Sequence, residues 1–123
     1  MLSNYRIKAI TLSTSRLIIR ELSYEDLNFV HLIHSIPEVQ EYATLGIPES
    51  LLASIEYLKK YIEDQNNEPR KEYGFCVSLA NGEPIGLVGL SSSLTKFNIA
   101  ELWFKLHPKH WGKGYITEVV ILF

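Results

Sequence analysis

Cysteine is almost absent from this sequence of 123 residues, because Cys76 is its only thiol. A single cysteine excludes both an intramolecular disulfide and a paired-thiol redox motif. Cys76 lies in an alternating apolar segment, so we expect it to fill space in the core, and a nucleophilic role is the less favoured alternative. A chain without disulfides is typical of a reducing compartment, and we expect a cytoplasmic location.

Long hydrophobic runs and an excess of basic charge are also missing. No apolar stretch approaches the roughly 18 residues that span a bilayer, and the N-terminal residues lack the apolar segment of a signal peptide. Lys and Arg number 12 against 14 Asp and Glu, a net charge of −2, which argues against nucleic-acid binding driven by overall charge. We therefore expect no membrane and no nucleic acid among the partners.

Histidines are few, and they form no recognisable metal motif. His31 and His34 lie three residues apart on a predicted helix, a spacing at which two imidazoles can share a metal ion. No Asp or Glu at a matching spacing completes such a site. Packing or surface roles are therefore favoured for both histidines, and we expect no metal.

Apolar periodicity predicts the order of secondary structure. Alternation with period two indicates strands, and apolar positions three and four apart after a capping serine (Ser23, Ser50) indicate helices. Asn81-Gly82 between two alternating runs predicts a hairpin, because both residues tolerate positive φ. The predicted strands are residues 16–22, 73–79, 84–90 and 99–106, and the predicted helices are residues 24–36, 51–64 and 115–123, with a short helical turn at 38–43.

The resulting order, β-α-α-β-β-β-α, predicts an α+β fold with helices packed on a mixed, mostly antiparallel sheet. Residues 1–123 show no linker or repeat, so we expect a single domain. The chain ends inside the apolar run at 119–123 without a capping glycine. We expect either that the domain is incomplete at its C-terminus or that another chain, as in a homo-oligomer, covers this end.

A glycine-bearing loop joins the last predicted strand to the last predicted helix. Pro108 ends the strand, and Gly112 and Gly114 flank Lys113 just before the helix. Backbone N–H groups at a helix start have no intrahelical partners, so such a loop can bind a phosphate or pyrophosphate. From the loop alone, a tight turn that needs positive φ at both glycines is an equal alternative.

The first predicted strand carries two arginines, Arg16 and Arg20. A solvated strand face or a structural ion pair is favoured for both, and direct contact with a substrate is the alternative.

Two segments of the chain resemble the GNAT superfamily of N-acetyltransferases. Thr14–Leu22 followed by Asp26 is similar to the opening strand of one branch, the ribosomal-protein alanine N-acetyltransferases, with its pattern T-x-R-L-x-(I/L)-R-x-L. Glu101–Glu118 looks like the family's fourth strand and acyl-CoA pyrophosphate loop, and it contains W-G-K-G-Y-I-T-E. One departure is Lys109, which stands where the family usually has Gln or Arg. Another is that the later strands and helix of the family fold have no counterpart.

The resemblance implies acetyl-CoA as the cosubstrate. In such proteins the fourth strand pairs with the pantetheine arm, a backbone N–H polarises the thioester carbonyl, and the loop holds the pyrophosphate. The N–H of Leu106 or of His107 is the candidate for the carbonyl. The residues implied in cofactor binding are Phe104, Leu106, His107, Lys109, His110, Trp111, Gly112, Lys113, Gly114 and Tyr115. For Tyr115, packing at the helix start is the favoured interpretation.

The resemblance also implies acetyl transfer to a primary amine, either a protein N-terminus or a small amine. An amine that is protonated at neutral pH needs a general base. Glu101 is the first candidate, with a structural or solvent-facing glutamate as the alternative. His107 is the second, and a locally hydrogen-bonded side chain is favoured for it. The general acid, a tyrosine in relatives, is expected beyond Phe123.

Two other functions stay open. One is a catalytically incomplete CoA-binding or assembly domain, completed by a partner or a swapped chain. A nucleotide-binding module is weaker, because the sequence has no GxxxxGK[ST] motif.

Overall fold

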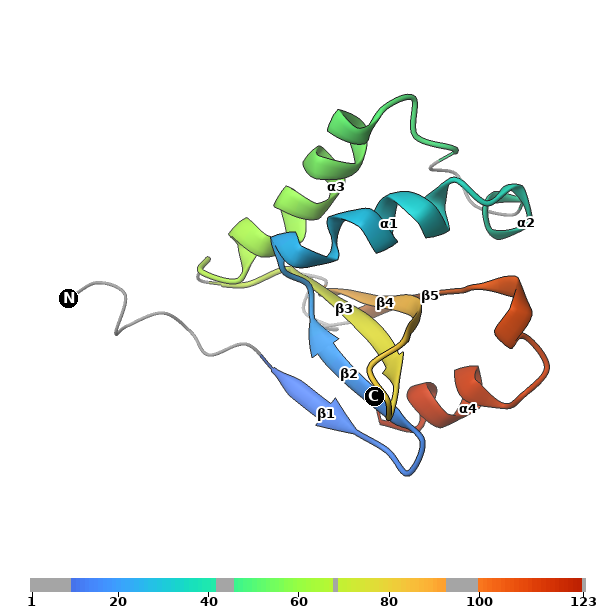
Figure 1. The fold of residues 1–123 in the computed structure, drawn as a ribbon. Coiled ribbons are helices and arrows are strands. Elements are labelled where there is room, and N and C mark those ends of the chain that lie inside the picture. The colour runs from blue at the N-terminus through green and yellow to red at the C-terminus, as the bar shows by residue number, and fades with distance from the viewer. Residues whose placement is uncertain (1–9, 42–45, 68, 93–99, 123) are drawn as a thin grey trace.

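The computed structural model describes residues 10–41, 46–67, 69–92 and 100–122. Within them, five strands form one sheet in the order β1-β2-β3-β4-β5 (Figure 1). Every neighbouring pair in this sheet is antiparallel, where a mixed sheet was predicted, and the α+β class is confirmed. The strands are β1 (Thr11–Ser13), β2 (Leu17–Glu21), β3 (Glu72–Leu79), β4 (Pro84–Ser92) and β5 (Ala100–Leu106).

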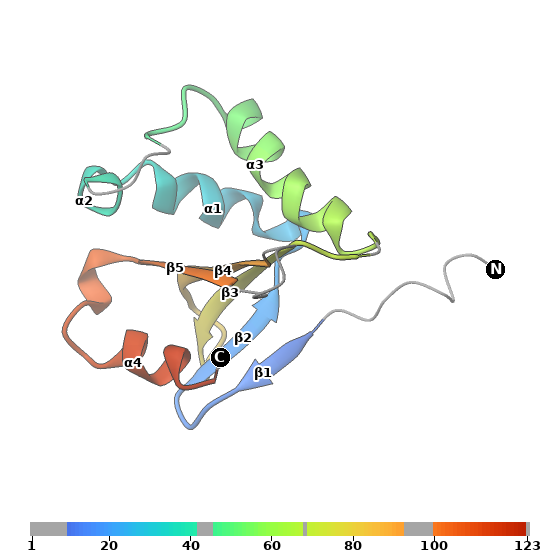
Figure 2. The same ribbon diagram turned by 180° about the vertical axis from the view of Figure 1, so that it is seen from behind.

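Helices cover both faces of the sheet. Figures 1 and 2 show α1 and α3 on one face and α4 on the other. The helices are α1 (Leu27–His34), α2 (Pro37–Gln40), α3 (Leu51–Asp64) and α4 (Tyr115–Val120), with 3-10 turns η2 (Tyr24–Asp26) and η3 (Pro108–His110). None of these helices is long and apolar enough to span a bilayer.

Side chains at two helix starts act as the sequence predicts. The Ser50 hydroxyl accepts a hydrogen bond from the Ala53 N–H at 3.3 Å, which satisfies one of the free donors of α3. Asp26 accepts the Ser23 N–H at 2.9 Å and so fixes the turn that leads from β2 into α1.

The main differences from the prediction concern β1, α2 and α4. β1 was missed, because a three-residue strand gains its order from pairing with β2 and not from its own pattern. Pro37 begins the short helix α2, at a position where its missing N–H costs nothing. α4 ends at Val120, short of the predicted residue 123. Residues 93–99 and 42–43 of the predicted loop and turn lie outside the described residues.

The sheet separates two apolar clusters. On the α4 face, the cluster contains Leu17, Ile19, Phe75, Val77, Ile85, Val88, Leu106 and Val119. On the α1–α3 face, it contains Leu22, Val30, Ile33, Leu58, Tyr61, Cys76 and Leu87. Cys76 is 1% exposed and burial raises its pKa to about 11, which confirms its role in the core.

A bulge in β4 decides which face each of its side chains takes. Val77 pairs with Gly86 and Ser78 with Pro84, so β4 has one extra residue, Ile85. The extra residue reverses the alternation. Ile85 therefore lies in the α4-side cluster although Leu87, two residues later, lies in the opposite one.

Candidate functional site

The outer edge of β5 is the first component of the candidate site. β5 is the last strand of the described sheet. The His107 N–H donates to the Ile85 carbonyl of β4 at 2.8 Å. Because successive residues of an edge strand point their backbone groups alternately toward and away from the neighbour, the Leu106 N–H faces the open edge. Of the two N–H groups that the sequence suggested for the thioester carbonyl, only that of Leu106 is not hydrogen-bonded to β4.

Trp111 closes the loop back onto this edge. Its indole Nε1 donates to the Leu106 carbonyl at 2.8 Å, while the ring remains about half exposed. The Trp111 indole thereby binds the carbonyl of Leu106, whose own N–H has no partner in β4. This bond marks the end of the open strand edge.

The loop between β5 and α4 turns at both predicted glycines. Gly112 has φ +76° and Gly114 has φ +80°, a region that other residues rarely adopt. A side chain at Gly112 would meet no atom within 4 Å, so the space above the loop is open. The two glycines therefore adopt the positive φ that the tight turn needs, and the space above Gly112 at the start of α4 is open.

Arg16 anchors this loop from the other end of the sheet. Its Nε donates to Glu118 Oε1 at 2.7 Å and its guanidinium donates to the Lys113 carbonyl at 3.1 Å. The same group lies 4.4 Å from the centre of the Tyr115 ring. Glu118 also accepts the Thr14 hydroxyl, and these bonds, with that from Thr14 the largest, lower its pKa. A residue of the β1–β2 turn thus holds the glycine loop.

Arg20 makes a second ion pair, on the other side of β2. Its two terminal nitrogens donate to the Asp26 carboxylate at 3.0 and 2.7 Å, and Asp26 is only 7% exposed. The hydrogen bond to Asp26 raises the Arg20 pKa. The ion-pair interpretation is confirmed for both arginines, but the sequence did not indicate that Arg16 bonds the loop.

Two of the three basic side chains of the loop, Lys109 and His110, lie against the same carboxylate oxygen of Glu83. Lys109 pairs with Glu83 of the β3–β4 hairpin at 3.3 Å, and Lys113 is exposed. His110 is 6% exposed, and its pKa is lowered chiefly by burial. Its Nε2 lies 3.5 Å from Glu83 Oε2, and neither ring nitrogen has a good hydrogen bond within the described residues.

The two candidate bases lie at opposite ends of β5. Glu101 is exposed and pairs with Ser91 near the start of the strand. His107 follows the end of the strand, and its Nδ1 accepts the Lys109 N–H at 3.2 Å, so the favoured local role is confirmed. Six residues of strand place their Cα atoms roughly 20 Å apart. A single thioester carbonyl therefore cannot have both side chains beside it.

The remaining predicted cofactor residues pack against the α4-side cluster. Phe104 and Tyr115 lie partly buried against it, and Leu106 is 4% exposed. The expected packing of Tyr115 at the helix start is confirmed. Any contact of Phe104 or Leu106 with a cofactor is then through the backbone at the strand edge.

Sequence analysis missed a polar cluster on the opposite face. His34 of α1 is 1% exposed, and its Nε2 lies 2.9 Å from Lys105 Nζ. Its ring meets Tyr57 edge-on at 4.5 Å. Burial and the charge of Lys105 lower the His34 pKa to about 3, and burial lowers the Lys105 pKa to about 8. The sequence signal that could have indicated this cluster is Lys105, the one charged residue in the otherwise apolar run Trp103–Leu106.

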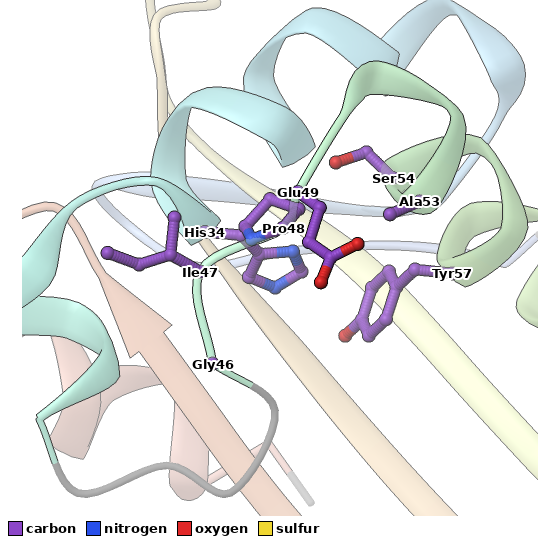
Figure 3. Close-up of a pocket in the computed structure, with 8 residues that line it drawn as sticks. All are labelled: His34, Gly46, Ile47, Pro48, Glu49, Ala53, Ser54 and Tyr57. Atoms are coloured by element: carbon purple, nitrogen blue, oxygen red, sulfur yellow. The ribbon is translucent and has the colours of Figure 1, made fainter.

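His34 and Tyr57 also line a cavity of about 310 Å³ (Figure 3). The remaining lining residues are Gly46, Ile47, Pro48, Glu49, Ala53 and Ser54. Figure 3 shows the His34, Glu49 and Tyr57 side chains among those that line it. Among the described residues, no group of three or more His, Cys, Asp or Glu could hold a metal ion.

Comparison with known proteins identifies relatives of the whole described fold. Residues 16–123 match the acetyltransferase (GNAT) domain. An uncharacterized N-acetyltransferase of Bacillus subtilis, YoaA, is 27% identical over 109 residues, which are 89% of this chain and 61% of that protein. The chain thus spans about three-fifths of the length of this relative.

Solved structures show the same relation. Spermidine N-acetyltransferase from Vibrio cholerae, solved with CoA and spermine, superposes with a TM-score of 0.73 at 29% identity, over 87% of this chain and 60% of that one. RimL, a ribosomal-protein alpha-N acetyltransferase in complex with coenzyme A, superposes at 0.70 with 12% identity, over 90% and 62%. The second likeness shows the fold alone. Because the acetyltransferase domain matches nearly the whole chain, this protein belongs to the GNAT acetyltransferase family.

Proposed function

We propose that this chain forms the acetyl-CoA-binding part of an N-acetyltransferase, which transfers an acetyl group from acetyl-CoA to a primary amine. The observation that carries the proposal is the continuous path from the open edge of β5 into the Gly112–Gly114 loop. A free strand edge can pair with the two amides of a pantetheine arm. A loop of exposed amides before a helix suits the pyrophosphate at its far end.

The backbone of β5 supplies the groups for the thioester. Phe104 and Leu106 point their amides to the open edge, because the alternation that faces His107 toward β4 faces them away. The Leu106 N–H is the donor that would polarise the thioester carbonyl and hold the oxyanion as the amine attacks. This N–H is held in place by the sheet and by the hydrogen bond from Trp111 to the Leu106 carbonyl, so it needs little reorganisation during the reaction.

Glu101 is the proposed general base. It shares a strand face with Trp103 and Lys105, which point toward α1 and α3, and it is exposed. Five residues of strand separate its Cα from that of Leu106, roughly 17 Å, so the proposal is that Glu101 takes the proton from the acceptor ammonium through intervening water and not from a place beside the thioester carbonyl. His107 is the weaker candidate, because its Nδ1 is engaged by Lys109. The base must remove a proton from the acceptor ammonium before attack, since only the neutral amine has a lone pair.

The class of acceptor is proposed from the relatives. The spermidine N-acetyltransferase from Vibrio cholerae, solved in complex with CoA and spermine, is 29% identical to this chain, which favours a small polyamine. The motif at residues 14–22 favours a protein N-terminus, as in the ribosomal-protein alanine branch. Both acceptors are primary amines, so the transfer step is the same for each.

A second candidate function is a CoA-binding or assembly domain that another chain completes. The supporting observation is the exposed apolar surface of α4, where Ile116, Val120 and Ile121 are 47%, 42% and 78% exposed. Surfaces of this kind commonly become covered in an assembly.

Calorimetric titration of the 123-residue chain with CoA, acetyl-CoA and ATP tests the cofactor claim. We expect binding of CoA and acetyl-CoA and markedly weaker binding of ATP. Absence of binding at millimolar CoA would overturn the proposal. Release of CoA in the presence of spermidine or an N-terminal peptide then separates an enzyme from a binding domain.

A pair of variants at one glycine sharpens the test. Gly114→Asp should weaken CoA binding by about a hundredfold, because it places a negative charge beside the proposed pyrophosphate site and strains a backbone with positive φ. Gly114→Asn is the matched control, since asparagine has the same shape and tolerates positive φ. Equal loss of affinity in both variants would assign the glycine to the turn alone.

A further inference from the structure

Lys105 is an unusual residue for its place in the fold. It lies on β5 between Phe104 and Leu106, pairs with Leu87 of β4, and is half-buried on the face covered by α1 and α3. Lysine side chains on a sheet face normally reach water, and buried ones are normally paired with a carboxylate. Among the ion pairs of the described residues, none includes Lys105.

The groups that contact the Lys105 amine are neutral. Its Nζ lies 2.9 Å from His34 Nε2 of α1, 5.4 Å from the Tyr57 ring centre of α3 and 5.2 Å from the Trp103 ring centre of β5. The titratable groups on the elements packed around it include His31, which contacts the Ser54 hydroxyl at 2.7 Å, and Tyr61, which contacts the Tyr57 ring. Two carboxylates also face this region: Glu49 lines the cavity with His34 and Tyr57, and Glu72 pairs with Lys60 at 3.8 Å. Among the ion pairs of the described residues, neither carboxylate pairs with Lys105.

This environment favours the uncharged amine. Burial lowers the Lys105 pKa to about 8, and the neighbouring lysine charge helps to lower the His34 pKa to about 3. His34 is therefore a neutral imidazole that accepts a hydrogen bond from Lys105. At pH 8 about half of the Lys105 side chains carry a free lone pair, compared with under about 1% of an ordinary exposed lysine.

The position of Lys105 places this amine beside the proposed thioester site. Its Cα is the immediate neighbour of Leu106, whose N–H faces the open edge of β5. A lysine side chain has four methylene groups and a mobile ammonium, so its nitrogen can reach around one strand.

We propose that the Lys105 ε-amine is itself an acyl acceptor and is acetylated by acetyl-CoA bound along the edge of β5. The inference rests on the proposed function, because it requires the cosubstrate at that edge. The amine lone pair attacks the thioester carbonyl carbon, a C–N bond forms, and the C–S bond breaks. The sulfur leaves with the electron pair and takes the proton that the nitrogen loses, so the products are N-acetyl-Lys105 and free CoA thiol.

Acetylation at this position changes the face that carries the cavity. The product amide cannot be charged, yet its N–H can still donate to His34 Nε2. The added acetyl group must be accommodated near His34 and Tyr57, both of which line the 310 Å³ cavity (Figure 3). Self-acetylation would therefore alter the shape and charge of that cavity together.

The test is to incubate the chain with isotopically labelled acetyl-CoA between pH 6.5 and 9.5 and to map acetyl-lysines by peptide mass spectrometry. Lys59, Lys60, Lys109 and Lys113, all exposed, are internal references. We expect Lys105 to be labelled at least tenfold faster than each of them at pH 7.5, with a pH midpoint near 8. Excess CoA should suppress the labelling.

Parallel labelling with a trace of acetic anhydride keeps the outcomes distinguishable, because it reports amine reactivity without the cofactor site. A preference for Lys105 with acetyl-CoA that excess CoA suppresses, and that exceeds its preference with acetic anhydride, supports the proposal. An equal preference with both reagents assigns the labelling to the reactivity of the amine alone and overturns it. If acetyl-CoA binds by calorimetry but labels Lys105 no faster than the references, self-acetylation is overturned and the proposed function stands. If CoA does not bind, both fail together.

Discussion

The two faces of the sheet hold their charged side chains in different ways. On the α4 face, Arg16 and Glu118 form an ion pair near the surface that also reaches the Lys113 carbonyl. On the α1–α3 face, Lys105 lies against a buried neutral histidine. The first arrangement fixes a loop and costs little desolvation. The second withdraws an amine from water without a counter-charge, and so changes its protonation.

β5 connects these two arrangements within adjacent residues. Leu106 packs on the α4 side and directs its amide to the open edge, while Lys105 directs its amine toward α1. The open edge of β5 is therefore packed by the α4-side cluster on one face, while the other face of the same strand carries the Lys105 amine.

Truncation of one buried side chain on each face should give the largest effect. Ile85→Ala and Leu87→Ala delete the same number of carbons from residues that are both fully buried on β4. Each should lower the free energy of unfolding by about 3 kcal/mol. We expect the larger loss for Leu87→Ala, because two helices cover its cluster and only the short α4 covers the other. Urea unfolding measures both, and an equal or reversed order would break the comparison.

Acid should weaken the α1–α3 face specifically. The His34 pKa is about 3 in the folded chain and near 6.5 when unfolded, so between these values the unfolded state binds the extra proton. Stability should therefore fall as pH falls through this window, by up to about 1.4 kcal/mol per pH unit. His34→Gln, which cannot titrate, should flatten the dependence.

The control for this prediction is His31→Gln on the same helix, whose ring contacts the buried Ser54 hydroxyl at 2.7 Å and not Lys105. Thermal unfolding from pH 4 to 7 should leave its pH slope close to that of the unaltered chain. A slope that disappears in the His31 variant instead would place the titration elsewhere.

Removal of the Arg16 side chain should have the smallest effect on the free energy of unfolding and a measurable effect on CoA affinity. Arg16→Met deletes the bonds to Glu118 and Lys113 from a partly exposed site, so unfolding should change by under about 1 kcal/mol. CoA affinity should fall about fivefold, because the loop is no longer held in one conformation.

Arg20→Met is the matched control, because it breaks an ion pair of similar geometry far from the loop. It leaves the buried Asp26 carboxylate without its partner, so we expect a loss of about 2 kcal/mol in stability and unchanged CoA affinity. If both variants reduce CoA affinity equally, Arg16 has no special role in the loop.

Local pattern was enough to predict most elements. β3 alternates along its length and is joined to β4 by an Asn-Gly turn, so the hairpin follows from neighbouring residues, although its bulged register does not. The glycine loop was recognisable because positive φ and a following apolar helix leave a signature at fixed spacing. β1 could not be predicted, because three residues have too little pattern and depend on β2.

The residues themselves determined the α+β class, the order of elements and the loop between β5 and α4, since each depends on periodicity, turn chemistry and capping within a few positions. Only the tertiary structure decided that the Leu106 amide, and not the His107 amide, is left unbonded by β4. It also decided that the side chain of Ile85, at the bulge, lies on the α4 side, and that Arg16 bonds Glu118 and the Lys113 carbonyl. It also brought His34 and Lys105 together across 71 positions. Such contacts depend on register and burial, and these exist only once distant segments have packed.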